Sequence, residues 1–315
     1  MYYKLPVSKY RSIKQLLHSY LIKTLSIDTY KAENVGIEDK KIPLHKDRDE
    51  NRVLYTSSVS LQLSKSQNWK TMQLASAIAS DLSRICGDVF SIQIVPPGWI
   101  HFELTDTALA TWLQSLVVGS LGEDGEEGSR EQGAGGKEVI FNSPPCPLPP
   151  APLPFVPNPQ SPIPNSLFAV QHAHARCCSL VLLAHREGLI KLREPVPNIS
   201  PAFWNVISPK PLPWLNCDGT LRLNHPDERH LIAELIQVVD NIECPDINGS
   251  VKWEKVALNL SQAFENFWCN CRIWGEVKIR SPELTQARLG LLMATQSVLR
   301  YVLEKNLGVF APLEL

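Results

Sequence analysis

The chain has 315 residues and a formal net charge of −1, with 44% hydrophobic and 20% charged residues, which is the composition of a soluble globular protein. This near-neutral balance excludes a global basic field that would attract nucleic acid non-specifically. The apolar runs are far shorter than the ~18 residues that a membrane span requires. The first residues lack the apolar stretch of a secretory signal, so we expect a cytoplasmic protein with no membrane partner.

Proline is the residue in clear excess. The chain has 25 prolines, about 8% against a usual ~5%, and 11 of them lie between Pro144 and Pro164. The preceding residues 119–138 carry seven glycines and six acidic against two basic residues, a composition that cannot bury a core. We therefore expect a disordered linker over residues 119–165, acidic and Gly-rich and then Pro-rich, which argues against a single continuous core. A plain spacer and a proline-rich ligand for a small adaptor domain both remain open.

Residues 1–118 predict a small N-terminal α/β domain. Apolar side chains recur at helical spacing over residues 13–21 and 71–86. They alternate with period two over residues 90–94 and 100–104, on either side of a Pro-Pro-Gly turn, which is typical of a pair of strands. A short closing helix is predicted by the spacing of Leu109, Trp112, Leu113 and Leu116.

Residues 166–315 predict an all-α bundle. Apolar residues spaced three and four apart predict four helices, over residues 166–188, 225–239, 251–270 and 283–307. The stretch between the first two helices holds six prolines together with Trp204 and Trp214, and we expect it to be irregular. The expected fold class of the whole chain is α+β.

No catalytic constellation is present in the sequence. It lacks a Gly-rich phosphate loop, a G-x-S-x-G elbow and an H-E-x-x-H motif. His172 and His174 lie two residues apart on an expected helix, so they point to different faces and should not bind a metal together. The eight cysteines form no C-x-x-C pair, which indicates packed, reduced thiols. We expect no catalytic residue, no cofactor and no metal.

Aromatic residues near the third predicted helix favour binding instead. Four rings lie beside amide side chains and a cation, at Phe264, Phe267, Trp268 and Trp274 with Asn266, Asn270 and Arg272. Bases of single-stranded RNA loops stack on such rings, while polar groups contact the base edges. Phe264, Phe267 and Cys271 also have the spacing of a core stripe, which leaves Trp268 as the position for a ligand.

Several segments resemble arginyl-tRNA synthetases in the order that the family shows. Residues 170–181, VQHAHARCCSLV, are similar to its Q-Y-A-H-A-R stretch, where the catalytic domain joins the anticodon-binding domain. The segments that resemble its DALR anticodon-binding domain are 224–237, 260–273 and 287–312. The segments that resemble its N-terminal additional domain are 53–65 and 96–104.

The resemblance implies a synthetase-like chain that lacks the catalytic core. In the family, a nucleotide-binding core with HIGH-type and KMSKS-type motifs lies between these parts, whereas this sequence has no H-x-G-H and no K-M-S-K. We therefore expect no arginine–tRNA ligase activity from this chain alone, and expect it to bind tRNA or another structured RNA through the bundle. The residues implied for the stacking and polar face are Trp268, Phe264, His172 and Arg272, with Arg288 supporting that face or simply lining the bundle.

A protein-interaction scaffold is the alternative, in which the Pro-rich linker or the stretch from Trp204 to Trp214 docks a protein partner. It is favoured by departures in the segments similar to the additional domain, where Leu54, Ser58 and His101 replace the family's Asp, Asn and Asn. The rings at His172 and Trp268 replace family tyrosines but can still stack on a base.

Overall fold

The computed structural model describes residues 12–26, 42–47, 52–67, 70–118, 165–193, 206–244 and 251–314. The linker expected over residues 119–165 lies outside the described residues except for Asn165, which begins a helix, and Trp204 lies outside them as well. The expectation that the proline segment binds a protein partner therefore stays a prediction.

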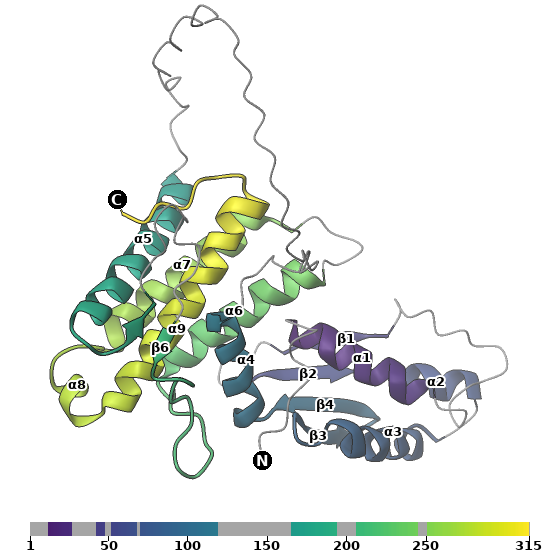
Figure 1. Cartoon of the computed structure of the whole chain (residues 1–315). Helices are drawn as coiled ribbons and strands as arrows, with labels where there is room; N and C mark the ends of the chain where they lie inside the picture. Colours follow the sequence, from purple (N-terminus) through teal and green to yellow (C-terminus); the bar gives the residue numbers. More distant parts are fainter. Residues whose placement is uncertain are drawn as a thin grey trace, which may run out of the picture.

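The N-terminal part is a four-stranded antiparallel sheet with helices on one face (Figure 1). The strands follow the order β1-β2-β4-β3, and their bounds are β1 Leu44–Lys46, β2 Leu54–Ser57, β3 Phe90–Val95 and β4 Trp99–Leu104. The helices are α1 (Ile13–Leu25), α2 (Val59–Gln67) and α3 (Thr71–Cys86). Burial alternates along the central strands, so that Tyr55, which pairs with Phe102, faces the helices while Thr56, which pairs with His101, faces outward.

The C-terminal part is a helical bundle around one central helix. Its helices are α5 (Asn165–Arg186), α6 (Pro226–Glu243), α7 (Trp253–Asn270), α8 (Glu276–Arg280) and α9 (Pro282–Tyr301), which continues as a π-helical turn over Val302–Asn306. α9 is buried along almost its whole length because α4 (Asp106–Val118), α5, α6 and α7 all pack against it. A two-stranded sheet, β5 (Lys191–Leu192) and β6 (Val206–Ser208), follows α5.

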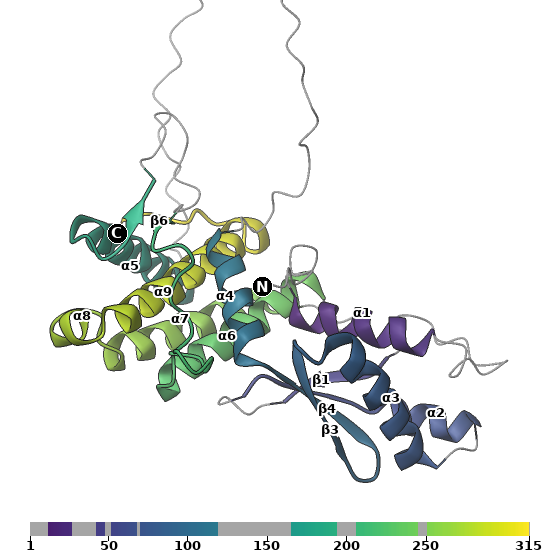
Figure 2. The ribbon, with the colours of Figure 1, turned by 60° about the horizontal axis from the view of Figure 1, so that its bottom comes forward.

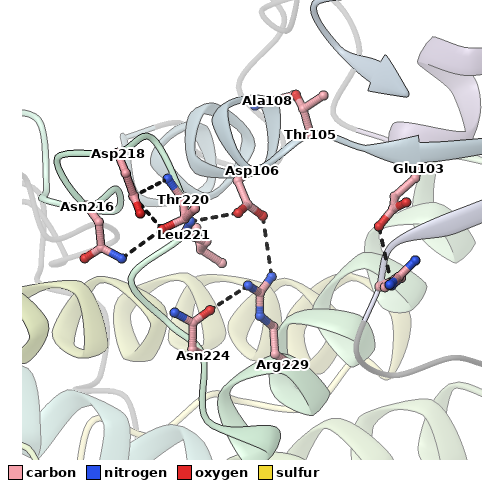
Figure 3. Close-up of polar contacts among 11 residues, drawn as sticks. Glu103, Thr105, Asp106, Ala108, Asn216, Asp218, Thr220, Leu221, Asn224 and Arg229 are labelled. Atoms are coloured by element: carbon pink, nitrogen blue, oxygen red, sulfur yellow. Dashed lines mark hydrogen bonds and ion pairs between the residues drawn. The ribbon is translucent and has the colours of Figure 1, made fainter. Parts of the chain in front are cut away.

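α4 (Asp106–Val118) connects the two parts and packs along α9. Gln114 Oε1 accepts hydrogen bonds from Trp214 Nε1 (2.9 Å) and from the backbone N–H of Leu212 (3.0 Å). Figure 3 shows the other end of α4, where Asp106 accepts a hydrogen bond from the backbone N–H of Leu221 (2.9 Å) and lies 3.7 Å from the guanidinium of Arg229. α4 is therefore fixed to the loop that leads into α6.

Buried residues of both parts form a single hydrophobic cluster. On the α6 side, Asp240 accepts hydrogen bonds from the Tyr55 hydroxyl and from Ser12 Oγ (2.7 Å), which are N-terminal residues. The inference from the clustered prolines against a single continuous core is wrong. α4 and α5, which precede and follow residues 119–164, both pack against α9 and both contribute side chains to the cluster.

Trp214 belongs to that core. Its side chain is only 3% exposed, and its ring covers Gly290 of α9, where a Cβ atom would lie 2.6 Å from the ring. The stretch before it holds the short strand β6, where the sequence predicts an irregular segment, and Trp214 itself is too buried to dock a protein partner. Docking of a protein partner by the rest of that stretch, which includes Trp204, stays a prediction.

The predicted α+β class and all the helices expected from periodicity are confirmed. β1, β2, α2, α8 and the small β5–β6 sheet are elements that the sequence pattern does not predict. By length and composition alone, residues 167–186 of α5 could cross a membrane, although 56% of that window is buried inside the protein, as in a core helix.

Candidate nucleic-acid interface

The outer face of α5 carries two rings and a cation at intervals of one helical turn, at Phe168, His172 and Arg176. The opposite face packs into the bundle through small and apolar residues: Val170, Ala173, Cys177, Val181 and Ala184. Phe168 and His172 are both exposed, and their rings stack with centroids 6.4 Å apart and planes 28° apart. The amphipathic pattern of α5 therefore leaves a strip of rings on the surface.

Trp268 of α7 lies beside this strip. The guanidinium carbon of Arg176 lies 5.2 Å from the centroid of the Trp268 ring, within the range of a cation–π interaction. Trp274, which follows α7, meets the edge of Trp268 with centroids 5.8 Å apart and planes 73° apart. We call these five side chains, Phe168, His172, Arg176, Trp268 and Trp274, the Arg176–Trp268 surface.

Two hydrogen-bond donors of this surface have no partner among the described residues. Among the described residues, neither Arg176 Nε nor Trp274 Nε1 has a hydrogen-bond acceptor, although both atoms are buried. An open hollow of about 290 Å³ adjoins Arg176, and its lining residues are His172, Ala175, Arg176, Ser179 and Leu180. Buried donors are normally satisfied, so a ligand with acceptor atoms fits this place.

The Arg176–Trp268 surface lies next to a carboxylate, and the cysteines of α5 are not reactive. His172 Nδ1 lies 3.8 Å from a carboxylate oxygen of Glu265 on α7. On the inner side of α5, burial raises the pKa of Cys178 to about 11 and raises the pKa of Cys177 well above its ordinary value. Both thiols stay protonated at neutral pH, and a protonated thiol is a poor nucleophile. The arrangement can stack on planar groups and donate hydrogen bonds.

Trp268 and His172, both predicted for the binding face, come together on the Arg176–Trp268 surface. Phe264 has no exposed area, so it packs in the core and cannot stack on a base here. Arg272 is exposed beyond the end of α7. The structure therefore places two of the predicted side chains on one surface and removes Phe264 from it.

Arg288 also lies away from that surface, because it is held inside the bundle. Its Nε donates to Glu228 Oε1 at 2.6 Å, and its Nη1 donates to the carbonyl of Arg272. Glu228 is 1% exposed and accepts a further hydrogen bond from the backbone N–H of His225 (2.8 Å), which completes the capping box of α6. Arg288 thus ties α9 to the start of α6 and to the end of α7, so it lines the bundle and does not support a binding face.

The two histidines of the H-x-H pair are separated as expected. His174 is fully buried, and its Nδ1 donates to the carbonyl of Pro312 (2.8 Å), which can only accept. Its Nε2 then accepts from the side-chain amide of Gln296 (2.9 Å). No cluster of metal-ligating side chains occurs in the part of the chain that the structure describes.

Sequence reasoning missed Arg176 and Phe168, and it named Trp274 among the nearby rings without assigning it to the binding face. A signal for the first two was present, since residues 168, 172 and 176 share one face of a helix. The lining residues of the hollow all lie on α5, and the spacing of apolar residues along that helix does not predict a hollow.

Residues 170–315 match the family model of the DALR anticodon binding domain. The arginine–tRNA ligase of Synechococcus sp. (strain JA-3-3Ab) is 30% identical over 149 residues, which is 47% of this chain and 22% of that protein. The chloroplastic/mitochondrial arginine–tRNA ligase of Arabidopsis thaliana is 31% identical over 138 residues, 43% of this chain and 17% of that protein.

A third relative, the arginine–tRNA ligase of Gloeobacter violaceus, is 29% identical over 137 residues, 43% of this chain and 20% of that protein. No solved structure matches the chain. The chain therefore spans only about a fifth of the length of these relatives, and the similarity predicted for its N-terminal segments stays a prediction. Residues 170–315 are therefore similar to the DALR anticodon binding domain, and just under half of the chain is similar to part of the arginine–tRNA ligases.

Proposed function

We propose that this chain is a non-catalytic protein that binds tRNA or another structured RNA through the Arg176–Trp268 surface. One observation carries the proposal: within an anticodon binding domain, Arg176 lies over Trp268 while Arg176 Nε and Trp274 Nε1 have no acceptor among the described residues. The relatives' name, arginine–tRNA ligase, makes tRNA the first RNA to test.

The chemistry of the surface suits an unpaired loop base. A ring such as Trp268 stacks on any base, and each such contact contributes about 1–3 kcal/mol to RNA affinity. Arg176 Nε and Trp274 Nε1 are buried, so they would meet acceptor atoms on the edge of a base or on a phosphate once neighbouring side chains move aside. His172 and Phe168, stacked on each other, offer a second ring pair one to two turns along α5.

The absence of aminoacylation is the second part of the proposal. It is supported by the sequence between α4 and α5, where residues 119–164 replace a nucleotide-binding core that would need several βαβ units of about 30 residues each. We expect no arginine-dependent exchange of pyrophosphate into ATP. Exchange above the background of a no-protein control would contradict this part and would leave RNA binding untouched.

RNA binding is tested by comparing wild type with Trp268→Ala in an equilibrium gel-shift or filter assay. The RNAs are a tRNA for arginine and a random RNA of equal length. We expect wild type to prefer the tRNA, and Trp268→Ala to lose about 1–3 kcal/mol of affinity because a stacked base loses its ring. Circular dichroism and urea unfolding establish that the variant is folded.

The matched control is Arg84→Gln, which removes an exposed arginine of α3 that is paired with Asp81 and lies outside the binding domain. Its RNA affinity should equal that of wild type. Equal affinity of wild type for both RNAs would overturn tRNA recognition. Unchanged affinity of a folded Trp268→Ala protein would remove the Arg176–Trp268 surface from RNA binding.

A further inference from the structure

The sheet of the N-terminal part has two edges of different character. β1 is three residues long, directly follows Pro43, and ends in Lys46, whose Nζ reaches the carbonyl of Ala233 in the bundle. β3 is six residues long, with the sequence FSIQIV, and contains no charge and no proline. Natural sheets protect edge strands with short length, charged side chains, proline or bulges. β1 has such protection and β3 has none.

The outer side of β3 presents unpaired backbone groups. The backbone N–H of Thr105 donates to the carbonyl of Val89 (3.0 Å), which sets the alternation of hydrogen-bonded pairs between β3 and β4. By that alternation, the N–H and C=O groups of Ser91 and Gln93 point toward β4, and those of Ile92 and Ile94 point away from it. The latter groups have no partner among the described residues.

No described element lies beyond β3 in the sheet, so this edge faces outward (Figure 2). Along the strand, Ser91 and Gln93 are exposed on the face opposite the helices. Ile92 and Ile94 are only partly buried although they face α3, since no neighbouring strand covers their outer side. An added strand would satisfy the free backbone groups and complete the burial of both isoleucines.

We propose that β3 pairs antiparallel with β3 of a second copy of this chain, which joins the two sheets into one across a two-fold axis. In the register that satisfies the free groups, Ile92 lies opposite Ile94 of the second copy, and Gln93 lies opposite its own equivalent. The pairing is isologous, which is the commonest symmetry of homo-oligomers. A second copy is the occupant because the strand is self-complementary: aliphatic side chains meet aliphatic ones, and no like charges are opposed.

The position of Gln93 on the two-fold axis supplies the test. The full chain is studied by sedimentation equilibrium over a range of concentrations, where wild type should approach twice the 35.3 kDa of one chain. Gln93→Lys and Gln93→Glu each place like charges directly opposite each other. Each variant should raise the dimer dissociation constant by up to about fivefold. A mixture of the two variants pairs opposite charges, so it should form the heterodimer in excess over either homodimer.

Gln237→Lys is the matched control, because Gln237 is an exposed residue of α6 that hydrogen-bonds only its neighbour Asn241 among the described residues (3.1 Å). It should dimerise like wild type. Monomeric wild type at every concentration up to the solubility limit would overturn the proposal. So would dimerisation that both Gln93 variants leave unchanged, or a mixture without excess heterodimer. The result does not depend on RNA binding.

Discussion

Two arginines of the bundle, Arg288 and Arg176, show opposite uses of the same side chain. Arg288 is almost fully buried, and its donors reach Glu228 and the carbonyl of Arg272. Arg176 lies at the surface over Trp268, and its Nε has no acceptor among the described residues. A guanidinium with satisfied donors fixes the fold, whereas one with open donors beside a ring and a hollow is available to a ligand.

The largest expected effect on stability comes from breaking the buried ion pair between Arg288 and Glu228. Arg288→Ala leaves the carboxylate of Glu228 buried without its cation, so the free energy of unfolding should fall by about 3–5 kcal/mol. Urea unfolding measures it. The control Arg280→Ala breaks an exposed pair with Glu276, whose side chains are 77% and 78% exposed, and should cost less than about 1 kcal/mol. Equal losses in the two variants would mean that Arg288 does not hold the bundle together.

Replacing Arg176 should lower RNA affinity and leave the stability of the fold almost unchanged. We expect Arg176→Gln to weaken RNA binding about tenfold, because it loses the cation over Trp268 and a charged donor. The same variant should change the free energy of unfolding by less than about 1 kcal/mol, since no ion pair of Arg176 is broken among the described residues. Filter binding and urea unfolding give the two numbers. A large loss of stability with unchanged RNA affinity would assign Arg176 to the fold.

The smallest effect concerns the buried histidine of the same helix. Burial lowers the pKa of His174 below its ordinary value of 6.5, with Arg300 lowering it further and Pro312 and Glu304 opposing the shift. The unfolded chain therefore takes up a proton near pH 6.5 that the folded protein still excludes. Stability is fully present above that pH and falls as the pH drops toward the lowered pKa, by at most about 1.4 kcal/mol per pH unit.

Urea unfolding between pH 8 and pH 5 measures this slope. His174→Gln has no imidazole to titrate, so its stability should fall less steeply over the acidic part of the range. A wild-type slope identical to that of His174→Gln would show that His174 titrates alike in the folded and unfolded chain.

The sequence predicted the long helices because their apolar faces persist over many turns. β1 and β2 were not predicted, because strands of three or four residues are too short for the alternation of apolar and polar side chains to be recognised. Arg288 is buried because it pairs with Glu228, which lies 60 residues away in the sequence. The residue pattern of α9 alone therefore could not predict its burial. Phe264 has the spacing of a core residue, and the structure shows that it is fully buried. Its spacing was therefore a better guide to its position than its aromatic ring.

Photo-crosslinking of the full chain to a tRNA for arginine, followed by mass spectrometry of the attached peptides, tests the central claim most directly. We predict that the crosslinked peptides come from α5 around Arg176 and from the end of α7 around Trp268. Crosslinks confined to the N-terminal sheet, or to the segment around Arg288, would contradict it.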